Sequence, residues 1–275
     1  MKFFKLLNIE LLKVRRYRAF WFMAGTYSLI LVFMIFGIPG LIDYVAEKTG
    51  NPTQLRIFKA VVFNFPDIWQ NIAFVAGLRY FIKILLGLIV IILVTSEYHF
   101  LTTRSMVISG LKKTDLVTAK TGMILFLALF STLLNFLSGL YLGSVHSPPS
   151  SMKYMFSHLE FLAGYFTELS VYLIFCMMIA VLVKKAGIAF IVHFLYLILE
   201  PVLDHKLPDS FSPWLPLNAI NRIVRTPNTS LIKVDSSEFN FDFQTALEWQ
   251  GVLICVAYGL IFLGISYLVT AKRDL

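Results

Sequence analysis

The sequence predicts an all-α membrane protein in which six transmembrane helices form one domain over residues 1–275. Three observations predict this class. Hydrophobic residues make up 58% of the chain and charged residues only 15%, whereas soluble domains are roughly 45–50% apolar and about 25% charged. The mean hydropathy is +0.76. The apolar residues also gather in six runs, each close to the roughly 20 residues that a helix needs to cross a bilayer. These observations exclude an ordinary soluble enzyme and a disordered chain.

The six runs differ in the charge that they carry. Three of them have no charged residue, the fourth contains Glu168, and the fifth contains His193 and Glu200. The second run is the weakest, because Arg79 and Lys83 lie near its start, although long basic side chains can reach the interface from a helix end. We predict spans at about residues 19–38, 78–96, 121–143, 161–183, 186–203 and 249–271.

The basic residues predict the orientation of the chain. Residues 1–18, residues 97–120, the pair Lys184-Lys185 and the C-terminal tail would lie on one side of the membrane. Together these segments hold more than half of the 24 Lys and Arg residues. Because cytoplasmic segments are enriched in Lys and Arg, we predict that the N- and C-termini are cytoplasmic and that residues 204–248 form an outer segment. The formal charge of +8 then needs no nucleic-acid partner.

Residues 1–18 predict an amphipathic helix that lies in the inner membrane interface. Apolar residues recur at helical spacing on one stripe, and basic residues occupy much of the remainder. Such a helix can serve only as an orientation signal, or it can also contact a cytoplasmic partner, and both alternatives remain open. The residues on which this prediction rests are Phe4, Leu7, Leu11, Arg15 and Arg16.

Residues 97–120 are too long for a tight turn and too apolar for a solvated loop. Apolar residues alternate with Arg and Lys, and Gly110 interrupts the pattern. We predict a short helix, a turn at Gly110, and then a helix that continues into the third span. A short amphipathic helix exposed in the cytoplasm needs a surface against which to bury its apolar side.

This loop resembles the cytoplasmic loop of type-2 ABC exporter permeases. In that family an acidic residue ends the second span, and a Gly-Thr-x-Arg-like stretch, a Pro-x-Arg-like turn and a Lys follow. In this chain Thr102 stands in place of the Gly, and Gly110 lies near the expected Pro. Residues 9–18 are also similar to the connecting helix of the family. The matching stretches of the loop are Ser96-Glu97-Tyr98, Thr102-Thr103-Arg104-Ser105-Met106, Gly110-Leu111-Lys112-Lys113-Thr114-Asp115-Leu116 and Lys120.

The resemblance implies a permease subunit of an ATP-driven ABC exporter in a bacterial cytoplasmic (inner) membrane. Two copies, or two related permeases, would form the translocation path, and each would bind a separate cytoplasmic ABC ATPase through a coupling helix in this loop. ATP and Mg would belong to that ATPase, because the chain has no Gly-x-x-x-x-Gly-Lys-Ser/Thr segment and no expected catalytic residue or cofactor of its own. The expected ATPase-coupling residues are Glu97, Leu101, Arg104, Met106, Ile108, Leu111, Lys112 and Lys113.

Four ionisable residues within the spans are candidates for an intramembrane polar path: Lys83, Glu168, His193 and Glu200. A charge at the centre of a bilayer costs roughly 2.5–3.5 kcal/mol. Each residue could reach the outer interface separately, Lys83 could pair with Glu168 or Glu200, or the residues could contact a substrate or a proton. His193 and Glu200 lie on one helical face, which allows either a relay or a histidine that packs and hydrogen-bonds. No spacing predicts a metal site.

Two other classes of function stay open. The chain could be an intramembrane enzyme that acts on lipid or peptide through Glu168, His193 or Glu200. It could also be an ATP-independent channel or scaffold. For an exporter, the apolar spans favour an amphipathic or hydrophobic substrate, such as a drug, an antimicrobial peptide or a lipid.

Overall fold

The computed structural model describes residues 2–49, 59, 62–77, 81–100, 102–208, 210–224, 244 and 246–272. Every regular element within these ranges is a helix. Six of the helices are long and apolar enough to cross a membrane, which confirms the predicted all-α class and the predicted number of spans. These helices are α2 (Arg18–Thr49), α5 (Phe81–His99), α7 (Lys113–His146), α8 (Glu160–Val183), α9 (Ala186–Lys206) and α11 (Trp249–Lys272).

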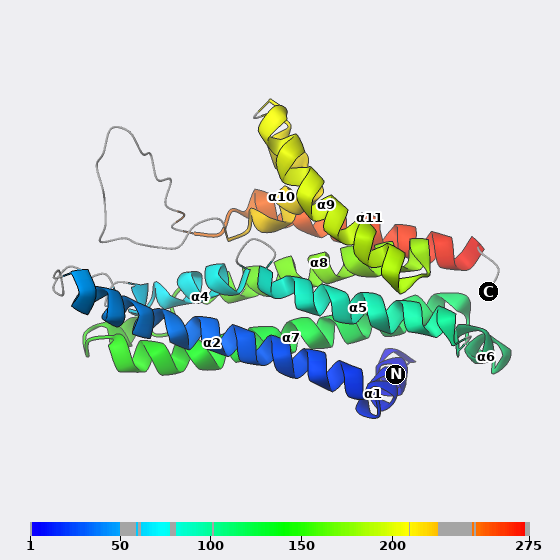
Figure 1. The fold of residues 1–275 in the computed structure, drawn as a ribbon, viewed down its shortest axis with the longest axis horizontal. Helices are drawn as coiled ribbons and strands as arrows, with labels where there is room; N and C mark the ends of the chain where they lie inside the picture. Colours follow the sequence, from blue (N-terminus) through cyan, green and yellow to red (C-terminus); the bar gives the residue numbers. More distant parts are fainter. Residues whose placement is uncertain are drawn as a thin grey trace.

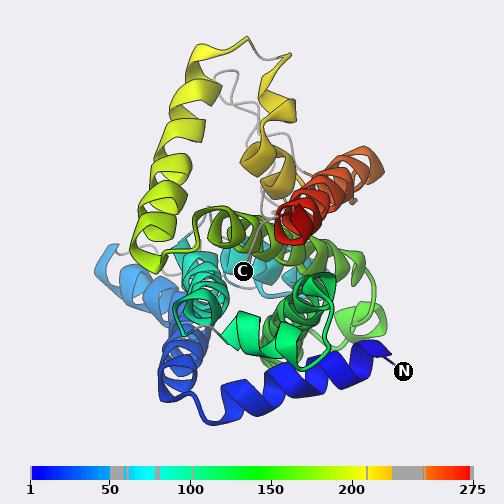
Figure 2. The same ribbon diagram turned by 90° about the vertical axis from the view of Figure 1, so that its right-hand side faces the viewer.

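The long helices other than α9 run lengthwise, and both ends of the chain lie at the same end of the bundle (Figure 1). The helix α6 (Thr102–Ile108) lies at this end too, and α1 (Lys2–Arg15) lies crosswise beside it (Figure 2). The other short elements are α4 (Ile68–Gly77), η2 (Ser151–Tyr154), η3 (Ser212–Trp214) and α10 (Pro216–Asn221). An even number of spans returns the chain to the side on which it began.

Two long helices extend beyond the apolar runs that predict them. The helix α2 passes through Pro39 and ends at Thr49, and α7 begins at Lys113 rather than near residue 121. A helix forms its backbone hydrogen bonds internally, so it can continue past its apolar part into a polar environment. The segment between α5 and α7 contains α6 and then Gly110, whose φ of 98° lies in the region that favours glycine. The short helix and the glycine turn are therefore both present.

The helix α8 lies at the centre of the bundle. In its most apolar stretch 72% of the residues are buried, compared with 22% in α2, α9 and α11. Polar groups on α8 are thus enclosed by protein and need partners there. The helix α9 instead leans away from the other long helices (Figures 1 and 2), and its buried residues are Ala189, His193, Leu197 and Glu200.

Small residues allow α4 and the turn before it to approach α7 closely. The Trp69 ring packs over Gly139 and stacks on Phe136 with 5.5 Å between ring centroids, and the Phe65 ring packs on Gly143. The Trp69 indole Nε1 also donates a hydrogen bond of 2.7 Å to the Met155 carbonyl oxygen. Glycine at these positions of α7 therefore makes room for two aromatic rings.

We expect Gly143→Ala to destabilise the fold, because the new methyl group would lie 2.2 Å from Phe65 Cζ. Overpacking of this kind costs about 1–3 kcal/mol, and thermal unfolding in detergent measures it. The matched control is Gly264→Ala on α11, where an added methyl group meets no atom within 4 Å. Equal melting temperatures for the two variants would refute the close approach.

Candidate functional site

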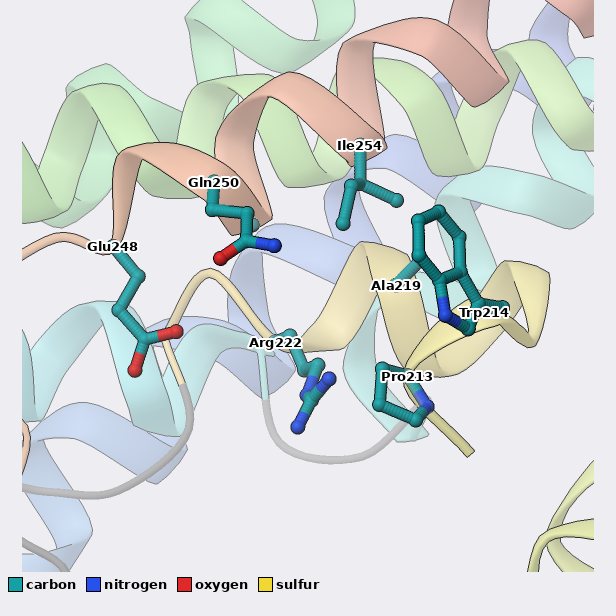
Figure 3. Close-up of a pocket in the computed structure, with 8 residues that line it drawn as sticks. Pro213, Trp214, Ala219, Arg222, Glu248, Gln250 and Ile254 are labelled. Carbon is teal, nitrogen blue, oxygen red and sulfur yellow. The ribbon is translucent and has the colours of Figure 1, made fainter. Parts of the chain in front are cut away.

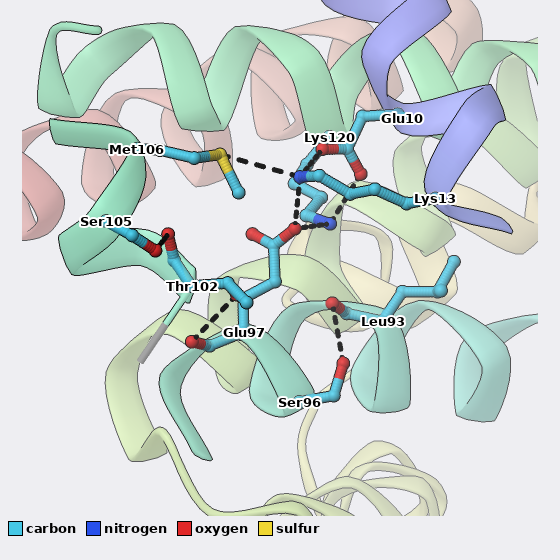
Figure 4. A network of polar contacts seen from close by, with 9 residues as sticks. All are labelled: Glu10, Lys13, Leu93, Ser96, Glu97, Thr102, Ser105, Met106 and Lys120. Carbon is cyan, nitrogen blue, oxygen red and sulfur yellow. Dashed lines mark hydrogen bonds and ion pairs between the residues drawn. The ribbon is translucent and has the colours of Figure 1, made fainter. Parts of the chain in front are cut away.

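Four charged side chains from three helices meet at the end of the bundle that holds the chain termini (Figure 4). Lys120 Nζ lies 2.6 Å from Glu10 Oε2 and 2.8 Å from Glu97 Oε1. Lys13 Nζ lies 2.5 Å from Glu10 Oε1 and 2.7 Å from the same Glu97 oxygen. Two lysines and two glutamates thus form a cluster without net charge, which we call the charge cluster.

The local sequence explains how each member reaches the charge cluster. Glu10 lies on the buried face of α1 between Leu6 and Val14, so packing of that face carries the carboxyl group inward. Glu97 lies in the last turn of α5, and Lys120 lies in the first turns of α7. The exposed fraction is 2% for Glu10 and 7% for Lys120. Because a buried charge without its partner is costly, the charge cluster ties α1, α5 and α7 together.

The Glu10 carboxyl responds to this environment. Burial alone would raise the pKa of Glu10, but the ammonium groups of Lys120 and Lys13 outweigh burial and lower the pKa below its ordinary value of 4.5. The carboxyl is therefore ionised at neutral pH and holds both lysines.

The residues predicted to couple to an ATPase occupy different environments. Glu97 belongs to the charge cluster, and Met106 Sδ lies 3.6 Å from Lys13 Nζ, which links α6 to α1. Ile108 is 78% exposed at the end of α6. Leu111 and Lys113 are partly buried, and Lys112 is exposed just before α7. Leu101 and the side chain of Arg104 lie outside the described part of the chain.

A groove of about 210 Å³ opens beside the charge cluster. All four charged residues of the cluster line it, and the aromatic side chains of Tyr17 and Phe100 stand at its walls. Phe100 is 69% exposed. The groove therefore combines polar groups with an exposed apolar rim.

The residues predicted to place α1 in the interface divide between two faces. Leu7 is partly buried and packs near Gly122 of α7, and Leu11 is also partly buried. Phe4 is 73% exposed, and Arg15 and Arg16 are exposed. One face of α1 thus packs on the bundle while Phe4 points away from it.

A second group of buried polar residues lies within the bundle. Lys83 Nζ of α5 lies 2.6 Å from Glu168 Oε1 of α8 and 2.5 Å from Asn221 Oδ1 of α10. It also lies 5.3 Å from the centre of the Tyr172 ring. Lys83 is 1% exposed and Glu168 is 3% exposed. Of the arrangements left open by the sequence, the structure contains the Lys83–Glu168 ion pair.

The other two candidates of the polar path have separate partners. His193 Nε2 lies 3.0 Å from the Tyr172 hydroxyl, and His193 Nδ1 lies 3.9 Å from Cys176 Sγ. Glu200 accepts a hydrogen bond of 2.7 Å from the Asn218 backbone N–H on α10. His193 and Cys176 are both 0% exposed, so a substrate cannot reach this pair in the present conformation. The arrangement fits a packing histidine rather than a relay to Glu200.

Several of these contacts were missed by the sequence analysis. Glu10 is the one acidic residue in a basic N-terminal segment, and Lys13 follows it at a spacing that favours pairing. This pattern could have marked both residues. No sequence pattern predicted the contact of Asn221 with Lys83, because polar residues are common in Pro-rich segments. Within the described ranges, no three His, Cys, Asp or Glu side chains come together as a metal site.

Six long apolar helices with buried, mutually paired charges define a polytopic helical membrane protein. A family model described as ABC-2 family transporter protein matches residues 6–200, and the chain belongs to this family. It is therefore an integral membrane protein and a membrane component of a transporter, of a kind that normally works with an ABC ATPase and is generally not catalytic itself. The resemblance drawn from the sequence is thereby confirmed. No curated protein matches the chain.

We expect Lys120→Met to destabilise the protein by about 3–5 kcal/mol, because it leaves Glu10 and Glu97 buried with Lys13 alone. Thermal unfolding measures the loss, and Lys5→Met, the same replacement at an exposed position of α1, is the matched control. If Lys120→Met melted like the control, the charge cluster would not hold the helices.

The lowered pKa of Glu10 predicts how the packing of α1 depends on pH. A carboxyl with a depressed pKa contributes stability that is present above its ordinary pKa of 4.5 and is lost as the pH falls through the lower folded value. The protection factors of the α1 amides against hydrogen exchange should therefore stay constant down to about pH 4.5 and fall below it. The Glu10→Gln variant should exchange faster at neutral pH and lose most of this dependence. Identical profiles for the two proteins would contradict the prediction.

Proposed function

We propose that this chain is the permease subunit of an ATP-driven exporter and that a cytoplasmic ABC ATPase binds it at α6 and the adjoining groove. The observation that carries the proposal is the physical link between α6 and the spans. Met106 of α6 lies against Lys13, and Lys13 shares Glu97 of α5 with Lys120 of α7. A force applied to α6 thus reaches two long helices and α1 through a short series of partly buried contacts.

The surface at this end suits a protein partner. Ile108 and Phe100 are large apolar residues that are 78% and 69% exposed beyond the apolar stretch of α5. The groove that Phe100 lines has room for a side chain of the partner. Apolar anchors beside a polar site are typical of protein interfaces. ATP and Mg would then lie on the ATPase, and its closure would move the spans.

The remaining parts of the proposal follow from the same role. Lys and Arg enrichment at the α1 and α6 end favours a cytoplasmic location for both termini, and the family resemblance favours a bacterial inner membrane. The exposed Phe4 side of α1 fits the inner membrane interface. A second copy or a related permease would complete the translocation path. The substrate class that we propose is amphipathic or hydrophobic: a drug, an antimicrobial peptide or a lipid.

We expect the native protein to copurify with a stoichiometric ATPase and the Ile108→Asp variant to lose it. Because the Ile108 side chain is 78% exposed, the bundle should remain folded. Loss of one apolar anchor, at about 1.5–3 kcal/mol, weakens binding by about tenfold or more. Pull-down and ATPase activity measure the effect.

The matched control is Phe156→Asp, which alters an exposed apolar residue between α7 and α8 at the opposite end of the bundle. It should retain the ATPase. Transport by vesicles that contain this chain alone, without ATP, would favour a channel and overturn the proposal. Turnover by the isolated chain that is lost with Glu168→Gln or His193→Ala would favour an intramembrane enzyme.

A further inference from the structure

A pocket of about 250 Å³ lies between α10 and the first turns of α11, with η3 at its edge (Figure 3). Its lining is divided by chemistry. Arg222, Glu248 and Gln250 lie toward one side, and Pro213, Trp214 and Ile254 lie toward the other. The pocket is therefore amphipathic, and neither the charge cluster nor the Lys83–Glu168 pair contributes to it.

The position of the pocket places it at the depth of lipid headgroups. Gln250 and Gly251 follow Trp249, the first residue of α11, which is apolar from there on. Figure 1 shows that α11 runs from its first turn, beside α10, toward the end of the bundle that holds the C-terminus. Trp249 and Trp214 are 73% and 58% exposed, and tryptophan is enriched where a membrane meets water.

The volume of the pocket fits part of a lipid molecule rather than a whole drug-sized ligand. Sites that enclose a whole drug-sized ligand occupy roughly 300–1,000 Å³, which is more than this pocket offers. A headgroup with its first chain atoms fits the volume better. The chains can then continue outward along the exposed apolar surface of α11, which includes Leu253.

The charges of the lining select the headgroup. A guanidinium group such as that of Arg222 binds phosphate through two parallel hydrogen bonds. A carboxylate such as that of Glu248 favours an ammonium group. We propose that this pocket binds the headgroup of a zwitterionic phospholipid, with the phosphate at Arg222 and the ammonium group toward Glu248. This site does not depend on the proposed transport function.

Titration calorimetry of the purified full chain with four short probes tests the site. Dihexanoyl phosphatidylethanolamine carries both charges, dihexanoyl phosphatidylglycerol lacks the ammonium group, dihexanoylglycerol lacks the headgroup, and phosphoethanolamine lacks the chains. We expect the first probe to bind at least tenfold more tightly than each of the others. Equal binding of dihexanoylglycerol would overturn the headgroup assignment, and equal binding of phosphoethanolamine would overturn the lipid.

Variants separate the pocket from other lipid contacts. An added Cβ at Gly251 meets no atom within 4 Å, so the Gly251→Leu variant should fold normally. Its side chain should fill the pocket and weaken the binding of phosphatidylethanolamine by at least tenfold. The matched control, Gly264→Leu, has the same free space on the same helix and should bind like the native chain. If the two variants bound phosphatidylethanolamine with equal affinity, the pocket would not be the binding site of the lipid.

Charge variants provide a second readout that does not rely on filling the pocket. Arg222→Gln should weaken the binding of both phospholipids by at least tenfold. Glu248→Gln, at an exposed position, should weaken the binding of phosphatidylethanolamine alone. Phosphatidylethanolamine would then bind no more tightly than phosphatidylglycerol. If Glu248→Gln left that advantage unchanged, the ammonium assignment would be wrong.

Discussion

Charged side chains enclosed by an apolar bundle have to be paired, and this constraint organises both ends of the structure. Lys120 meets Glu10 and Glu97 at one end, and Lys83 meets Glu168 nearer the other. A buried ion pair adds little net stability over an apolar contact, but removal of one partner is costly. The pairs therefore act mainly on specificity, because arrangements that separate these helices leave a bare charge inside the bundle.

Both groups of charges also position helices too short to be stable alone. The helices α6 and α10 have seven and six residues, and isolated helices shorter than about 12–15 residues are marginal in water. The Lys13 ammonium contacts Met106 of α6. Lys83 and Glu200 hold α10 through Asn221 and the Asn218 backbone. Charges within predicted spans thus have a structural explanation that requires no substrate.

The sequence was informative where one physical property dominates. Apolar runs predicted the six long helices because crossing a bilayer requires them, and Gly110 predicted a turn because its φ is unfavourable for other residues. The ends of α2 and α7 were not predictable, because a helix continues past its apolar part. The partner of Lys83 remained open between Glu168 and Glu200. Periodicity gives the face on which a residue lies but does not identify the helix opposite. The spacing of Glu10 and Lys13 could have marked Glu10, but not its partner Lys120 on α7.

The attachments of α10 constrain how the bundle can move. Through Asn218 the helix is bonded to α9, through Asn221 to α5, and the Tyr258 hydroxyl of α11 donates to the Trp214 carbonyl oxygen just before it. A motion that separates α9 from α5 must break one of the first two bonds, and α10 then moves with the helix to which it is still bonded. If α10 moves with α9, it shifts relative to α11, and the pocket between them changes shape. A molecule bound in that pocket therefore opposes this movement of α10. The opposing free energy equals the binding free energy that is lost when the pocket changes shape.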